Sequence, residues 1–264
     1  MGDPPRVASD ARFLHVQDLT LTFGGLRVLD RVGMTVDRGT VCGLVGPNGA
    51  GKTSLFNCVS GHYRPDSGSV LVDGADALRV PPHRLAALGV ARTFQHPWVD
   101  QNVTVLDNVL VGGHTRVRGG PVSLALRLPL VRHDEARLRR RAMELLDWLD
   151  LARAAGRPAG SLPFGSAKRI EIARALLAEP RLLMLDEPAS GVAHEDVDAL
   201  AGLVLRLRGE LGLTVVLVEH HMGMVSAVTD KVVALVEGRK VAEGTAEQVR
   251  QDPAVVEAYL GTVA

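Results

Sequence analysis

The first 75 residues alternate short apolar runs with turn signals. The apolar runs are β-branched or alternate with polar residues, and they occupy residues 14–23, 33–36, 40–45 and 69–73. Between them stand the turn signals GG, DRG and RPDSG. A period of two between such turns predicts strands, and short connections predict antiparallel pairing. The sequence therefore predicts an antiparallel β region folded around a first parallel strand at residues 40–45.

Between residue 96 and about residue 164 the pattern becomes helical. The main amphipathic run extends from His133 to Asp150 and places Leu138, Leu145, Leu146 and Leu149 on one face. Pro and Gly residues in VRGGPVS and GRPAGSLP bracket this segment. We therefore expect residues 96–164 to form a helical subdomain that is inserted into an α/β core.

Three short apolar strands are predicted after this subdomain, at residues 181–188, 213–221 and 231–244. A helical run at residues 194–211 separates the first two strands. Strand, helix and strand in this order predict right-handed parallel crossovers. The predicted fold is thus α/β. Its core, with the β subdomain, comprises residues 12–95 and 165–264, and residues 1–11 form a flexible tail.

Composition and charge narrow the range of partners. The 264 residues include 30 basic and 30 acidic side chains, so no net field recruits nucleic acid or an anionic membrane, and we expect no nucleic-acid partner. No apolar run reaches the roughly 18 residues of a membrane span, and the N-terminal residues lack a signal-peptide core. Cys42 and Cys58 lie in apolar runs, which favours buried free thiols and fits a reducing cytoplasm. Any role at a membrane is expected to come through a partner.

The segment GPNGAGKT fits the phosphate-binding pattern GxxxxGK[ST], between an apolar strand and a helical run. Its glycines let the backbone wrap closely around phosphate, and its amides and the helix N-terminus point at the anion. Lys52 would reach the outer phosphates, and the Thr53 hydroxyl would ligate Mg²⁺. The alternative is a Gly-rich turn that binds nothing. The predicted ATP-binding residues of this segment are Gly46, Pro47, Asn48, Gly49, Ala50, Gly51, Lys52, Thr53 and Ser54.

Two acidic residues, Asp186 and Glu187, stand at the C-terminal end of an apolar strand. Open α/β sheets place their ligand chemistry at this end of the strands. Asp186 would hold Mg²⁺ through its hydration shell, and Glu187 would polarise the attacking water. Alone, the pair would fit the charged start of a helix equally well, but together with the phosphate-binding segment it indicates ATP hydrolysis.

With these motifs the chain resembles the nucleotide-binding subunits of ABC transporters over nearly its whole length. The resemblance implies that Gln95, in ARTFQ, lies near magnesium and senses the nucleotide state. It also implies that His220, rather than its neighbour His221, contacts the γ-phosphate, and that Phe23 stacks on adenine. Core packing is the alternative role for Phe23. The expected architecture is a P-loop NTPase core with an antiparallel β subdomain and an inserted helical subdomain.

Three further segments narrow the resemblance: FGGLRVLD, VARTFQHPWVDQNVTVLDNVLVGGH and the closing AYLGT. They are similar to the ATPase subunits of importers for branched-chain amino acids and of the related urea or short-amide importers. The resemblance implies a second ATPase subunit, often non-identical, two membrane permease subunits and an external solute-binding protein that acts indirectly. The chain would then lie at the cytoplasmic face of the plasma membrane. Trp98 would be either an anchor for a membrane partner or a core residue of the helical subdomain.

The ABC signature, usually LSGGQ, is altered in this chain. Gly165 can still open a helix whose amides face phosphate, so Gly165 and Ser166 are predicted to contact ATP. Pro163 lacks the hydroxyl that would touch the γ-phosphate, and it also lacks a backbone donor. Ser166 is shorter than the usual amide. The matching residues are Leu162, Pro163, Phe164, Gly165 and Ser166.

A second departure follows Glu187, where Ala193 and His194 replace the usual Asp or Asn and its neighbour. Ala193 cannot donate or accept a side-chain hydrogen bond across a dimer. In the sandwich dimer of this family, each ATP lies between the P-loop of one subunit and the signature of the other. The altered signature of this chain would therefore belong to the ATP site on the partner's P-loop. The intact Lys52 and Glu187 would belong to the site on this chain's own P-loop. This predicts an asymmetric heterodimer in which the site on this P-loop hydrolyses ATP and the other site is slower.

Other functions fit the sequence less well. A soluble ABC ATPase of DNA repair or translation usually carries a long coiled-coil insertion or a second cassette, and the sequence shows neither. A P-loop GTPase is disfavoured because no NKxD segment occurs. A nucleotide-gated module with weak ATPase activity remains an alternative to the importer ATPase. The transported solute is not specified by this chain.

Overall fold

The computed structural model describes residues 12–94, 98–116, 129–192 and 196–260. The chain divides into two compact units, Met1–Leu88 with Asp198–Ala264 (unit 1) and Gly89–Val197 (unit 2). The predicted domain boundaries, with a helical subdomain at 96–164, follow secondary structure, whereas the two units are defined by compactness. The predicted domain division therefore stays a prediction. The predicted tail, residues 1–11, lies outside the described residues.

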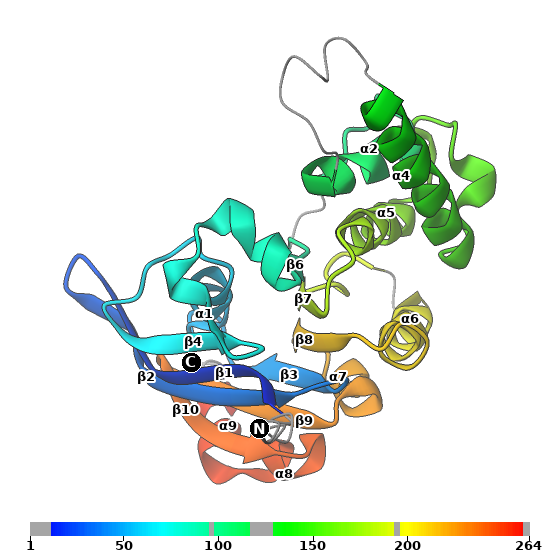
Figure 1. Ribbon diagram of the computed structural model, residues 1–264. Helices are drawn as coiled ribbons and strands as arrows, with labels where there is room; N and C mark the ends of the chain where they lie inside the picture. Colours follow the sequence, from blue (N-terminus) through cyan, green and yellow to red (C-terminus); the bar gives the residue numbers. More distant parts are fainter. Residues whose placement is uncertain (1–11, 95–97, 117–128, 193–195, 261–264) are drawn as a thin grey trace, which may run out of the picture. The chain divides into compact units, whose positions relative to one another are not determined.

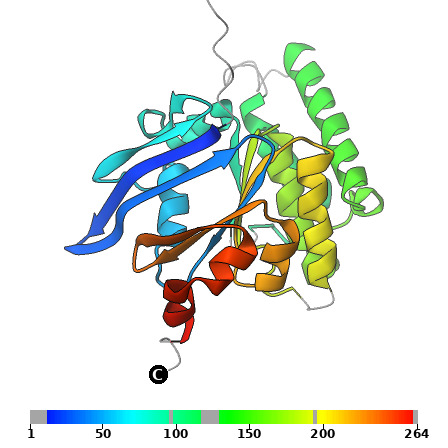
Figure 2. The same cartoon turned by 90° about the horizontal axis from the view of Figure 1, so that it is seen from below.

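The first part of unit 1 is an antiparallel sheet in the order β2-β1-β4-β5. β1 (Arg12–Phe23) and β2 (Leu26–Asp37) run side by side as a long hairpin (Figures 1 and 2). β4 (Ser67–Val72) pairs with the other edge of β1, and β5 (Ala75–Asp76) pairs with β4. Alternate apolar side chains of β1 and β2 are buried, as their period of two predicts. The predicted antiparallel β region is therefore confirmed.

The second part of unit 1 is built on parallel strands. β3 (Val41–Val45) pairs in parallel with β8 (Thr214–Val218) on one side and β9 (Lys231–Val236) on the other. Every residue of β3 and β8 is buried, as expected for strands that are covered on both faces. The helices of this part are α1 (Lys52–Val59), α6 (Val197–Gly209) and α7 (Met222–Val228), and short 3₁₀ turns occupy Ala77–Arg79 and Pro82–Leu88.

The prediction of a single strand at residues 231–244 is wrong. β9 ends at Val236, and β10 (Arg239–Gly244) returns antiparallel beside it. Glu237 and Gly238 form the two-residue turn with φ of 47° and 75°. Two positive φ values in succession match the twist of a tight hairpin. Beyond it, α8 (Ala246–Gln251) and α9 (Pro253–Leu260) pack beside β9 and β10 (Figure 1).

Unit 2 combines two parallel strands with helices. β6 (Val90–Arg92) pairs with β7 (Leu182–Asp186). The helices are α2 (Val105–Leu110), α4 (Pro129–Trp148) and α5 (Phe164–Leu177), with 3₁₀ turns at Val111–Arg116 (η3), Ala152–Ala154 and Ala159–Ser161. The four leucines predicted on one face of the long helical run are all buried, so its amphipathic face is confirmed.

Two exposures bear on the sequence predictions. Trp98 is 83% exposed, so its alternative as a core residue of the helical subdomain is wrong. Cys42 and Cys58 are buried free thiols, as predicted.

Among the described helices, none is long and apolar enough to cross a membrane.

Candidate nucleotide-binding site

The predicted phosphate-binding segment forms a tight turn between β3 and α1 in unit 1. Gly46, Gly49 and Gly51 adopt φ of 147°, 80° and 98°. At Gly46 an added Cβ would lie 2.1 Å from the carbonyl oxygen of Leu235, so only glycine fits between the loop and β9. The loop can therefore turn its amides toward a bound anion while it stays pressed against the sheet.

Lys52 begins α1 with a buried side chain. Its ammonium donates hydrogen bonds to the carbonyl oxygens of Gly46 and Pro47, at 2.7 and 2.9 Å. These bonds hold a positive charge inside the turn, where a phosphate would bind. Thr53 and Asn48 are exposed, Pro47 and Ser54 are half-buried, and Ala50 is buried. Thr53 is thus an exposed residue in the first turn of α1.

Phe23 lies at the end of β1 and is 46% exposed, so it is not a core residue. Its ring makes an edge-to-face contact with the ring of Tyr63, with ring centroids 5.1 Å apart at an interplanar angle of 78°. Edge-to-face contacts of this kind fix a ring while leaving part of its surface open. The sequence interpretation missed Tyr63, because no local pattern joins the end of β1 to the segment after α1.

The structure distinguishes the two histidines that follow β8. His221 is the N-cap of α7, and its Nδ1 accepts a hydrogen bond from the Met224 amide at 3.2 Å. His220 is exposed, and its backbone amide donates to the Glu219 carboxylate at 3.0 Å. His221 is therefore used to begin a helix, whereas the side chain of His220 is open to solvent.

In unit 2, Asp186 and Glu187 stand at the C-terminal end of β7. Asp186 is buried and pairs with Arg92 of the neighbouring β6, with 2.7 Å between Nη2 and Oδ2. The Asp186 amide also donates to the Thr93 hydroxyl at 3.3 Å. Glu187 is half-buried and has a φ of 46°, a left-handed conformation that is unusual for a residue with a side chain. Arg92 was missed by sequence reasoning, since its partner lies 94 residues away.

Gln95 lies outside the described residues, but the chain on both sides of it is held by α5. The Phe94 amide donates to Glu171 Oε1 at 2.8 Å, and Arg174 Nη1 donates to the Trp98 carbonyl oxygen at 2.5 Å. Glu171 is 1% exposed, and burial raises the pKa of its carboxyl. One face of α5 thus fixes the two ends of the segment that contains Gln95, a role that the sequence did not predict.

The altered signature lies at the start of α5. Pro163 is its N-cap and provides no side-chain hydrogen bond, and no acidic residue occupies the first turn. A Cβ added at Gly165 would meet no atom within 4 Å, so the backbone there faces open space. Ser166 is half-buried, and its amide donates to the Pro163 carbonyl at 2.9 Å. Ala193 and His194 lie outside the described residues.

The donors of unit 1 fit the phosphates of a nucleotide, because a glycine-rich turn before α1 holds the Lys52 ammonium against its own carbonyl oxygens. In the described parts of the chain, no group of three or more His, Cys, Asp or Glu side chains could hold a metal ion. Mg²⁺ in nucleotide sites requires only one or two carboxylates besides phosphate and water. A single aspartate can therefore be a sufficient carboxylate contribution to such a site.

A sequence-family model described as ABC transporter matches residues 29–190, which include the P-loop and the Asp186–Glu187 pair. The chain belongs to the ABC transporter family. It is thus an ATP-binding subunit of an ABC transporter, of the class that couples ATP hydrolysis to transport. A second model, for the branched-chain amino acid ATP-binding cassette transporter, matches residues 239–264.

Similar proteins extend this ABC assignment over almost the whole chain. The high-affinity branched-chain amino acid transport ATP-binding protein BraF of Pseudomonas aeruginosa is 39% identical over 248 residues, covering 94% of this chain and 97% of BraF. Its counterpart LivG of Escherichia coli is 37% identical with the same coverage. A crystal structure of a nucleotide-free ATP-binding cassette from an ABC transporter matches with a TM-score of 0.83 and 32% identity, covering 94% of this chain and 98% of that one. The predicted ABC ATPase fold is confirmed.

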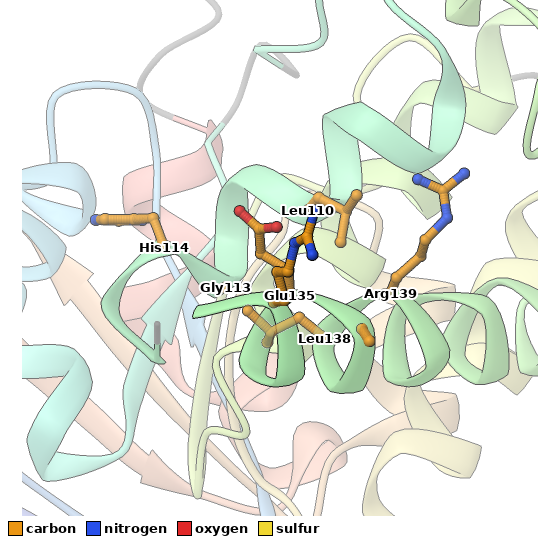
Figure 3. A pocket seen from close by; sticks show the side chains of 8 residues that line it. Leu110, Gly113, His114, Glu135, Leu138 and Arg139 are labelled. Carbon is orange, nitrogen blue, oxygen red and sulfur yellow. The ribbon is translucent and has the colours of Figure 1, made fainter. Parts of the chain in front are cut away.

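This ABC subunit also has a cavity of about 590 Å³ within unit 2, and none of the predicted ATP-binding residues lines it. It lies between α2 and η3 on one side and α4 on the other (Figure 3). Its lining mixes apolar and charged side chains: Leu110, Gly113, His114, Arg132, Glu135, Ala136, Leu138 and Arg139.

Proposed function

We propose that this chain is the ATP-hydrolysing subunit of an importer for branched-chain amino acids. The observation that carries the proposal is the P-loop turn with its buried Lys52, in a chain whose relatives BraF and LivG are named branched-chain amino acid transport proteins. The match of residues 239–264 to the branched-chain amino acid cassette model supports the same solute class.

The proposed roles rest on the sequence motifs, supported by the burial of Lys52 and the exposure of Phe23. Lys52 and the P-loop amides bind the phosphates, and the exposed Phe23 stacks on the adenine. Bound Mg²⁺ would neutralise the charge that develops on the transferred phosphoryl group. Thr53, Gln95 and Asp186 are the residues that would hold it.

Glu187 is proposed to accept a hydrogen bond from the attacking water and to draw its proton, so that the water oxygen approaches the γ-phosphorus as the bond to the leaving ADP breaks. His220 is proposed to donate a hydrogen bond to the γ-phosphate from its exposed side chain. Gly165 and Ser166 would use the open N-terminus of α5 to contact the ATP held by a second ATPase subunit.

The proposed assembly contains a second ATPase subunit and two permease subunits at the cytoplasmic face of the plasma membrane, and an external solute-binding protein acts indirectly. The exposed indole of Trp98 is proposed as an anchor for a permease subunit, since exposed tryptophans often dominate protein interfaces. Arg174 donates a hydrogen bond to the Trp98 carbonyl oxygen, which helps to hold the backbone of the anchor.

The signature with Pro163 and Ser166 is proposed to make the partner's ATP site slower than the site on this P-loop. The change Glu187→Gln in this subunit should therefore reduce turnover more than the equivalent change in the other ATPase subunit. Equal losses in the two variants would contradict an asymmetric dimer.

Uptake measurements test the proposed solute. In cells that carry the complete transporter and lack the chromosomal copy of this gene, wild-type protein should restore uptake of radiolabelled leucine, and Lys52→Ala should not. Arg141→Ala, an exposed change on α4, is the matched control and should behave as wild type. Uptake of radiolabelled urea or acetamide without uptake of leucine, isoleucine or valine would overturn the proposed solute class.

A further inference from the structure

The C-terminal helix α9 contacts the P-loop through one side chain, Tyr259. The amide of Gly46 donates a hydrogen bond to the Tyr259 hydroxyl oxygen at 3.1 Å, across 213 positions of sequence. Tyr259 belongs to the closing segment AYLGT, which contributes no residue to the proposed nucleotide chemistry. The contact therefore joins a segment without an assigned function to the first residue of the phosphate-binding turn.

Packing holds the Tyr259 ring in this position. The ring is half-buried against an apolar cluster that includes Val45 of β3, Val232 of β9 and Val255 of α9. Burial raises the pKa of Tyr259, although the bond from Gly46 opposes the shift, so the hydroxyl stays neutral and protonated at physiological pH. A neutral hydroxyl oxygen in a packed ring is a fixed acceptor for the Gly46 amide.

The neighbourhood of Gly46 explains why a fixed acceptor matters there. The φ of Gly46 is 147°, and its backbone presses against the Leu235 carbonyl of β9. A second bond from the same part of the chain, from the Gly238 amide to the Ala50 carbonyl at 3.1 Å, ties the other end of the turn. Hydrogen bonds thus join both ends of the segment 46–50 to residues 231–260, from Gly46 to Tyr259 and from Gly238 to Ala50.

We propose that Tyr259 is a positioning residue for nucleotide binding, whose hydroxyl holds the first amide of the P-loop in the conformation that receives phosphate. Docking of α9 thereby contributes to the affinity of the P-loop for ATP. The proposal rests on the P-loop being the nucleotide site. Without the hydroxyl the turn samples other conformations, and ATP binding has to select the competent one, which weakens the apparent affinity.

Tyr259→Phe in the full chain removes the hydroxyl and keeps the ring. Isothermal titration with ATP and Mg²⁺ should show a Kd about two- to tenfold higher than wild type, the range expected for the loss of one hydrogen bond. In the complete transporter the KM for ATP should rise similarly, with kcat at saturating ATP unchanged. An unchanged Kd would overturn the proposal.

Two further variants of α9 separate positioning from a general loss of packing. Val256→Ala changes an exposed neighbour and should match wild type in both Kd and Tm. Val255→Ala removes buried methyl groups and should lower the Tm more than Tyr259→Phe while changing the Kd less. If the Kd instead follows the Tm across the variants, Tyr259 is only structural and the proposal fails. If wild type itself binds no ATP, the proposed function fails as well.

Discussion

The buried ion pair between Arg92 and Asp186 should be a main support of unit 2. Its side chains are 8% and 4% exposed, and 2.7 Å separates Nη2 from Oδ2. Arg92→Ala would leave a carboxylate inside the protein without its guanidinium partner. Removal of one member of such a pair typically costs about 3–5 kcal/mol of unfolding free energy. We expect a loss of this size in urea unfolding of the full chain, followed by circular dichroism.

The matched control is the exposed pair of Arg141 and Glu144 on α4, at 2.9 Å with side chains 42% and 63% exposed. Arg141→Ala should cost no more than about 1 kcal/mol, since surface pairs contribute little. The double variant Arg92→Ala with Asp186→Asn should recover part of the loss, because it removes the unpaired charge. Equal stabilities of Arg92→Ala and Arg141→Ala, or no recovery in the double variant, would refute the reasoning.

Two further predictions concern buried titratable groups. Burial raises the pKa of Glu171, so its contribution to stability is fully present below the ordinary carboxyl pKa of about 4.3 and is lost as pH rises through the folded pKa. In urea unfolding, the free energy of unfolding of Glu171→Gln should therefore rise relative to that of wild type from pH 4 to pH 8. A difference independent of pH would contradict this. Burial also raises the pKa of the Cys42 and Cys58 thiols to about 12. Neither thiol should therefore react with a disulfide reagent at pH 8 until the chain unfolds. Rapid labelling of the native chain would contradict this, because it would show that the thiols are accessible.

The features that the sequence predicts well are local ones. The segment GPNGAGKT carries its own signal in the spacing of its glycines, and the period of two in β1 needs only neighbouring residues. The leucine face of α4 follows from the helical period in the same way. The pattern does not predict the hairpin of β9 and β10, because Glu237–Gly238 is a weaker turn signal than Asn-Gly or Asp-Gly and the apolar run therefore resembles one continuous strand.

The contacts that were missed depend on pairs distant in sequence. No sequence signal near Gly46 indicates that its amide donates a hydrogen bond to Tyr259. Likewise, no signal near Gln95 indicates that Glu171 and Arg174 bind the backbone on either side of it. Such pairs form only when the packing of whole elements brings them together. The sequence also leaves the exposure of Trp98 open, because one aromatic residue after a strand belongs to no periodic pattern of buried and exposed positions.

The central claim is that this subunit hydrolyses ATP at its own P-loop with Glu187 as the group that activates water. Phosphate release, measured with Mg²⁺ and ATP on the purified complex with the other subunits, tests it most directly. Glu187→Gln should retain ATP binding and lose about 10²- to 10⁴-fold in turnover at this site, and Lys52→Ala should lose binding as well. Turnover by Glu187→Gln at the wild-type rate, with Lys52→Ala still binding ATP, would contradict the account.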